Sequence, residues 1–208
     1  MEEIVQLNSN AKLSEHLASP SEATLSNLSE LNCVRLSPHF SLGEFTKSSS
    51  HPEVYNIPSH EAIANLKRLC TWLEELRKRY NERLNNPLLR PPLAPPTFLD
   101  KPSGIAERGG GINTEEPIRI NSGYRSPQLN RKIGGAATSN HLTGCAVDIK
   151  VSGMEQALRY AVILMDYADE SKQEFDELLI ERNRYGAIWV HFAVRPKDNR
   201  RKILFINA

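Results

Sequence analysis

The chain has 208 residues, 39% of them hydrophobic and 25% charged, which is the composition of an ordinary soluble folded protein. This length suffices for one domain with a sizeable core, alone or with an appendage. The formal net charge of +1 argues against nucleic acid as a partner, because such binding needs a clear basic excess on one face. No apolar run reaches the roughly 18 residues of a membrane-spanning helix, so we expect no membrane span.

Residues 1–36 are rich in Ser, Asn, Leu and Glu, and we expect them to form a loosely ordered N-terminal arm. The compact domain is expected to comprise residues 37–208 and to begin with a short element around Phe40–Phe45. A strong amphipathic helix is predicted from Ser59, a suitable N-cap, to Asn81. Its apolar residues recur every three or four positions at Ile63, Leu66, Leu69, Cys70, Leu73 and Leu76.

Residues 85–116 contain six prolines and a triple glycine, which cannot continue a helix or a central strand. We interpret this segment as an insertion in the domain. The elements predicted after it are a strand at 117–123, a helical turn at 124–131, a strand at 145–151, a helix at 154–168, strands at 175–181 and 188–194, and an edge strand at 202–206. Few long helices beside a small antiparallel sheet indicate the α+β class, with helices flanking the sheet.

The three cysteines, Cys33, Cys70 and Cys145, are scattered and form no Cys-x-x-Cys pair. An odd and sparse set of this kind does not suggest a disulfide framework. Cys70 lies on the apolar stripe of the predicted helix and Cys145 in a predicted strand, so we expect both to be small buried hydrophobic residues.

Two imidazoles and one carboxylate, His141, Asp148 and His191, form the most informative set of side chains. A catalytic zinc ion takes three protein ligands of these types and keeps a fourth position for water. Strand alternation places His191 opposite an apolar face and Asp148 opposite the inward-pointing residues of its own strand. Gly144 permits a tight turn that brings His141 back beside Asp148.

Five segments, in this order, resemble the zinc D-alanyl-D-alanine carboxypeptidase family. They are Ser122-Gly-Tyr-Arg-Ser126, Leu129-Asn130, Gly134-Gly135, Ser139-x-His141-x-x-Gly144-x-Ala146-x-Asp148 and Trp189-Val-His191. That family shares its fold with the Hedgehog signalling domain and includes peptidoglycan endopeptidases and phage endolysins. The similarity covers about residues 38–194 and excludes the N-terminal arm and the proline-rich insertion.

The resemblance implies that His141, Asp148 and His191 bind Zn²⁺, which lowers the pKa of its bound water toward ~7. It implies further that Arg125 holds a terminal carboxylate or a carbonyl of the substrate, for which a planar guanidinium is suited; a structural ion pair is the alternative. Ser139 either bonds the substrate or orients His141.

Two aromatic residues complete the candidate substrate site: Tyr124, beside the family arginine, and Trp189, two residues before His191. The general base is less well marked. Some relatives have a Glu three residues before the last His ligand, where this chain has Ile188. Glu181 ends an acidic strand similar to one in closer relatives, and we assign it the role of base.

The sequence therefore predicts a zinc metallopeptidase, a hydrolase of bonds to D-amino acids in the stem peptides of the bacterial cell wall, of carboxypeptidase or endopeptidase type. One alternative is a non-catalytic module that binds peptidoglycan or a partner around a structural zinc. Another is an iron(II) oxygenase with a His-His-Asp triad, although six residues separate His141 from Asp148, where those enzymes typically have one.

We expect a monomer whose partner is a peptidoglycan peptide. Residues Met1–Leu7 begin acidic and lack the basic and apolar regions of a secretory signal. The expected location is thus the cytoplasm on synthesis, with action at the cell wall or periplasm after release by another route.

Overall fold

A computed structural model of the chain describes residues 33–86 and 115–207. Its helices are α2 (Leu42–Thr46), α3 (His60–Asn85), α4 (Pro127–Lys132), the 3₁₀ helix η1 (Asn140–Thr143) and α5 (Met154–Ser171). Its strands are β1 (Ile120–Ser122), β2 (Ala146–Lys150), β3 (Glu177–Arg182), β4 (Ile188–Ala193) and β5 (Lys202–Asn207). The predicted α+β class with a small sheet and flanking helices is confirmed.

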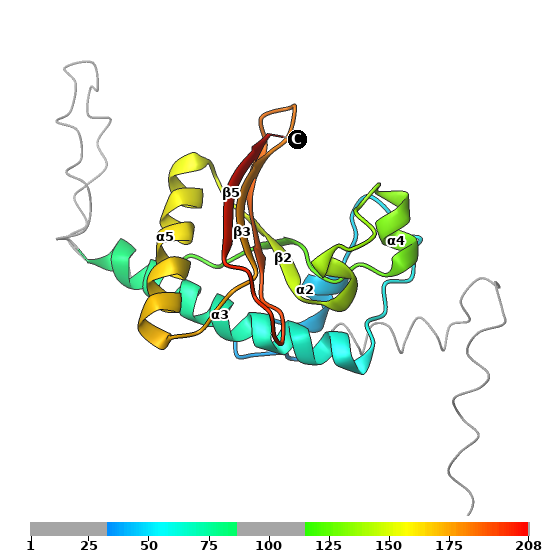
Figure 1. The fold of residues 1–208 in the computed structure, drawn as a ribbon, viewed down its shortest axis with the longest axis horizontal. Helices are drawn as coiled ribbons and strands as arrows, with labels where there is room; N and C mark the ends of the chain where they lie inside the picture. Colours follow the sequence, from blue (N-terminus) through cyan, green and yellow to red (C-terminus); the bar gives the residue numbers. More distant parts are fainter. Residues whose placement is uncertain (1–32, 87–114, 208) are drawn as a thin grey trace, which may run out of the picture.

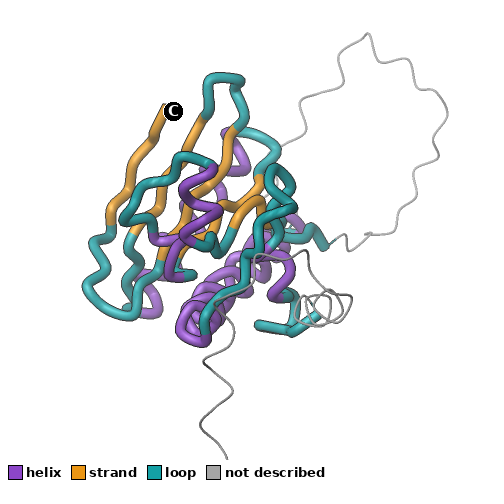
Figure 2. The backbone as a smooth tube through the Cα atoms, turned by 90° about the vertical axis from the view of Figure 1, so that its right-hand side faces the viewer, coloured by secondary structure: helices purple, strands orange, loops and turns teal. Residues whose placement is uncertain are grey.

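The five strands form one sheet in the order β1-β2-β4-β3-β5. The pairs β1–β2, β2–β4 and β3–β4 are antiparallel, as expected, but β5 lies parallel to β3 at the edge, where Figure 2 shows the C-terminus. The direction of β5 follows from the path of the segment that connects β4 to β5. Strand β4 ends level with the start of β3, and the next residues cross that end of β3, where Arg201 N donates to Phe175 O. The sheet is therefore mixed rather than wholly antiparallel.

Strand alternation separates a core face from a site face, as the sequence predicted. Val147 and Ile149 of β2 and Val190 and Phe192 of β4 are fully buried on the core face. Helices α3 and α5 bring their apolar stripes to the same hydrophobic core, and each fully buried aliphatic side chain contributes roughly 1.5–3 kcal/mol there. Figure 1 shows the sheet nearly edge-on, with α5 on one side, α4 on the other and α3 running beneath both.

Helix α3 begins after Ser59, whose side chain accepts a hydrogen bond from Ala62 N, so the predicted N-cap is confirmed. The helix ends at Asn85 rather than at the predicted Asn81. Its last turn is held to α5, because Arg83 Nη2 donates to Asp166 Oδ2 at 2.8 Å. No proline stands between Pro58 and Pro87, so the helical hydrogen bonds can continue to the end of that stretch.

The expected domain limits differ slightly from the described structure. Leu36 lies in the hydrophobic core, so the last residue of the expected arm already belongs to the compact part. Residues 1–32 of the arm and 87–114 of the insertion lie outside the described residues. Within the described ranges, no helix is both long enough and apolar enough to cross a bilayer. Cys70 and Cys145 are buried, as predicted.

Candidate metal centre

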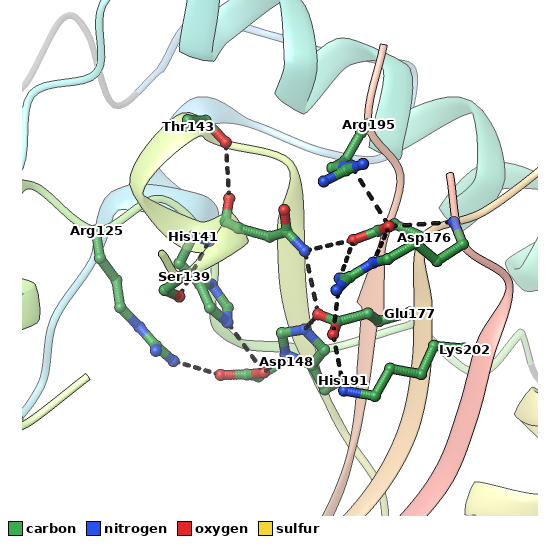
Figure 3. A network of polar contacts seen from close by, with 12 residues as sticks. Arg125, Ser139, His141, Thr143, Asp148, Asp176, Glu177, His191, Arg195 and Lys202 are labelled. Carbon is green, nitrogen blue, oxygen red and sulfur yellow. Dashed lines mark hydrogen bonds and ion pairs between the residues drawn. The ribbon is translucent and has the colours of Figure 1, made fainter. Parts of the chain in front are cut away.

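The three predicted ligands converge on the site face of the sheet. His141, Asp148 and His191 are all buried, and one donor atom from each lies within 4.8 Å of the other two. Asp148 Oδ1 is 3.3 Å from His141 Nε2 and 2.9 Å from His191 Nδ1. Figure 3 shows Asp148 between Arg125 and the two imidazoles. The first two ligands are seven positions apart in the sequence and the last two are forty-three positions apart, so only folding brings them together.

His141 is placed by the turn that contains it. Ser139 caps η1, its hydroxyl accepting a hydrogen bond from the backbone N–H of His141 at 3.3 Å. Gly144 ends the turn with φ +70°, in the left-handed region that favours glycine. A Cβ at Gly144 would lie 2.5 Å from the carbonyl oxygen of Ala62 in α3. The turn therefore packs directly against the backbone of the long helix α3. This contact helps to fix the position of His141, which lies in the same turn.

A backbone carbonyl sets the tautomer of His141. Its Nδ1 lies 2.6 Å from Gly123 O, which can only accept, so Nδ1 carries the proton and Nε2 carries the lone pair. Gly123 packs closely on α2, since a Cβ there would lie 2.7 Å from Phe45 Cβ. The lone pair of Nε2 thus faces the carboxylate oxygen of Asp148, an arrangement that a cation between the two atoms stabilises.

Asp148 and His191 are directly opposite each other on the antiparallel strands β2 and β4. The second carboxylate oxygen, Oδ2, accepts a hydrogen bond from Arg125 Nη2 at 2.5 Å, and Arg125 Nε donates to Ser122 Oγ at 2.9 Å. Burial opposes the charge on Asp148, but the two imidazoles outweigh it and hold the pKa of Asp148 below its usual range. The carboxylate is therefore ionised at neutral pH, as a metal ligand must be.

The two imidazoles differ in their protonation. Burial lowers the pKa of His141, which favours the neutral form needed for metal binding. Burial acts in the same direction on His191, but contacts with Asp148 and Glu177 outweigh it and raise the pKa of His191 to about 9. A metal ion that binds at neutral pH must therefore displace a proton from His191.

Two acidic residues of β3 share the site face with His191, because Glu177, Leu179 and Glu181 lie opposite Ala193, His191 and Trp189. Glu177 Oε2 is 3.6 Å from His191 Nε2. The contact with His191, with help from nearby cations, outweighs burial and lowers the pKa of Glu177 to about 2. Burial raises the pKa of Glu181, and the charge of Asp148 adds to this effect.

The four predicted substrate residues are placed differently from one another. Arg125 takes part in the ion pair with Asp148, which was the structural alternative for this residue. Ser139 caps the turn before His141 and so has the orienting geometry. Tyr124 is buried and belongs to the hydrophobic core, whereas Trp189 lies half-buried on the site face beside Glu181.

Three features of the site were not predicted: Glu177, the carbonyl of Gly123, and Asn140, whose side-chain amide donates a hydrogen bond to Glu177. Alternation along β3 could have signalled Glu177, because it places Glu177 and Glu181 on one face. Nothing in the sequence signals the carbonyl of Gly123, because every residue carries one.

The donor set fits zinc. Two imidazole nitrogens and one carboxylate oxygen are ligands that Zn²⁺ accepts in three-residue sites, and all three groups are buried and orientated by neighbours. The geometry accordingly supports a site for a divalent cation.

A family model described as Peptidase M15 matches residues 112–181. This span covers about a third of the chain and includes His141, Asp148, Arg125 and Glu181, while His191 lies beyond its end. The match confirms the resemblance to the zinc D-alanyl-D-alanine carboxypeptidase family over this part of the chain, and it supports a metallopeptidase in general. No curated protein matches the chain.

Proposed function

From the peptidase family matched by residues 112–181, we propose that this protein is a zinc peptidase that hydrolyses bonds to D-amino acids in peptidoglycan stem peptides. The observation that carries the proposal is the convergence of the His141, Asp148 and His191 donors within 4.8 Å. Such a substrate would place its action at the cell wall or periplasm.

The three converging residues are the proposed ligands. A zinc ion bound there supplies a water ligand whose pKa falls toward ~7 and a Lewis acid for a carbonyl group. The chain contributes the remaining parts: Gly123 O keeps the Nδ1 proton on His141, and Arg125 keeps the Oδ2 atom of Asp148 engaged. Both contacts orient the donor groups before an ion binds.

Glu181 is the proposed general base, and its environment favours it over Glu177. An efficient base has a pKa near the working pH, so that it is ionised but still accepts a proton. Burial raises the pKa of Glu181 toward that range, whereas the contact with His191 lowers the pKa of Glu177 to about 2. Glu181 lies on the same sheet face as His191. From there it can accept a proton from the attacking water and donate it to the leaving amine.

Arg125 is the proposed anchor for the substrate. Its Nε and Nη2 atoms are directed to Ser122 and Asp148, and we assign its Nη1 atom to a carboxylate or carbonyl of the peptide. Trp189, half-buried beside Glu181, offers an apolar surface to the peptide. The ion pair with Asp148 limits the movement of the guanidinium, which suits a group that must hold a substrate in one orientation.

A second candidate function is a non-catalytic module that binds peptidoglycan through the same fold around a structural zinc. Ile188 favours it, because an apolar residue stands where some relatives carry their acid. In that case Glu181→Gln would leave peptide binding intact, and there would be no turnover to lose.

The deciding experiment incubates the zinc-loaded protein with a stem pentapeptide ending in D-Ala-D-Ala and, separately, with cross-linked dimers, and analyses the products by mass spectrometry. We expect cleavage that a chelator abolishes and that zinc restores. Glu181→Gln should lower kcat roughly 10²–10⁴-fold, the usual contribution of a general base. Its zinc content should equal that of the wild type.

The control is Asp148→Asn, which should lose both zinc and activity. Cleavage that persists in the chelator-treated protein would contradict the proposal, as would full zinc occupancy without any turnover; the latter supports the binding module. Purification without added metal distinguishes the iron alternative, since bound iron in place of zinc would favour an oxygenase.

A further inference from the structure

Glu177 occupies a protected position beside the second histidine of the metal site. It is the first residue of β3 and lies opposite Ala193, two residues from His191 along β4. Its side chain is only 15% exposed, and its Oε2 atom is 3.6 Å from His191 Nε2. This is an ion-pair distance, roughly 0.5 Å longer than a hydrogen bond.

Three neighbours fix the orientation of the Glu177 carboxylate. Asn140 Nδ2 donates to Oε2 at 3.1 Å, Arg200 Nη2 lies 3.0 Å from Oε1, and Lys202 Nζ lies 3.4 Å from Oε1. The two cations contact Oε1, while Oε2 faces His191; Figure 3 shows Glu177 with Lys202 and His191 beside it. Asn140 directly precedes His141, so one short turn carries the first ligand and also orients the partner of the last.

Each of the two metal-site histidines needs a hydrogen-bond acceptor for the ring N–H that does not bind the metal. A histidine that binds a metal through one nitrogen usually donates its other N–H to a carboxylate or a carbonyl, which fixes the tautomer and the ring orientation. For His141 this partner is Gly123 O at 2.6 Å. For His191 the nitrogen beside the other ligands is Nδ1, 2.9 Å from Asp148 Oδ1, so the proton belongs on Nε2, which faces Glu177.

We propose that Glu177 is a positioning residue for the metal site, which accepts the Nε2 proton of His191 and so presents the Nδ1 lone pair to the ion. The proposal rests on the metal site of the proposed function. It assigns the two acids of β3 different roles: Glu181 acts on the substrate, while Glu177 acts through His191. Removal of Glu177 should therefore weaken metal binding, which removal of Glu181 should not do.

The test measures zinc affinity by competition with a chromophoric chelator in the full chain. Glu177→Ala should weaken affinity roughly 10–100-fold, the usual effect of removing such a partner. Glu177→Gln keeps a neutral acceptor, and a neutral hydrogen bond is about half as strong as a charge-assisted one, so a loss of roughly 3–10-fold is expected. The absorption spectrum of the cobalt-substituted protein should shift in both variants, since the orientation of His191 changes.

The matched control is Glu174→Gln, which removes the same charge three residues earlier, at an exposed position that pairs with Arg201 at 3.7 Å. It should bind zinc and cobalt as the wild type does. Wild-type affinity and spectrum in Glu177→Ala would overturn the proposal, and if that variant does not fold, wild-type values in Glu177→Gln would do so. An equal loss in Glu174→Gln would also overturn it, because general electrostatics would then explain the effect.

The two proposals fail differently. If the wild type binds no zinc, the proposed function itself is contradicted and this inference falls with it. If the wild type binds zinc and cleaves stem peptides while the Glu177 variants bind zinc normally, only the role of Glu177 is refuted.

Discussion

Gly144→Ala tests the contact that places the first histidine of the metal site. The substitution adds a methyl group at a residue with φ +70°, and a left-handed conformation costs a non-glycine residue roughly 1–2 kcal/mol. The new Cβ would also lie 2.5 Å from Ala62 O, which is backbone and cannot rotate away. Overpacking of this kind adds typically about 1–3 kcal/mol. We therefore expect the free energy of unfolding to fall by about 2–5 kcal/mol.

Gly134→Ala is the matched control for this prediction. Gly134 has φ +71°, almost the same as Gly144, but a Cβ there has nothing within 4 Å. It should lose only the conformational cost, about 1–2 kcal/mol. Urea unfolding of the two variants and the wild type, followed by circular dichroism, gives both differences.

The difference between the two variants isolates the contact of the η1 turn with α3. Equal losses in Gly144→Ala and Gly134→Ala would refute the close approach of the turn to the helix. The contact also predicts a functional effect, because a turn pushed away from α3 carries His141 with it. Zinc affinity should therefore fall in Gly144→Ala and stay unchanged in Gly134→Ala.

Three further predictions concern the site and its surroundings. Gly123→Ala places a Cβ 2.7 Å from Phe45 Cβ and displaces the carbonyl that accepts the His141 proton, so zinc affinity should fall roughly tenfold or more by chelator competition. The pKa of Asp176 lies below its usual value of 3.8, because hydrogen bonds outweigh burial; its stabilisation is present above pH 4 and lost as pH falls further. Asp176→Asn should thus cost roughly 1.5–3 kcal/mol at pH 7 and flatten the acid limb of unfolding curves, and an unchanged acid limb would contradict this. Of the three cysteines only Cys33 is exposed, so one thiol should react with Ellman's reagent in the native protein and three in denaturant. Rapid reaction of two thiols in the native protein would refute the burial of Cys70 and Cys145.

Much of the fold was predictable because it depends on local periodicity. The three- and four-residue spacing of apolar residues located α3, and strict alternation identified the core faces of β2 and β4. The choice of His141, Asp148 and His191 as ligands came from the resemblance to the zinc carboxypeptidase family, and local patterns agreed with it. Alternation directed Asp148 and His191 away from the core, and Gly144 allowed the intervening turn.

Other features depend on distances between segments far apart in the chain, which no local pattern encodes. The direction of β5 depends on where the loop after β4 crosses the end of β3. The ion pair of Arg125 with Asp148 depends on how closely the loop after β1 approaches β2.

The amino-acid order was enough to specify which donor types the site contains and which strand face they occupy, because side-chain chemistry and a two-residue period are local properties. It could not specify which of the two acids on β3 contacts His191. The register between β3 and β4, the cations Arg200 and Lys202, and the amide of Asn140 decide that choice. These groups meet only when the sheet has formed, since hydrogen-bond and ion-pair energies fall steeply with distance.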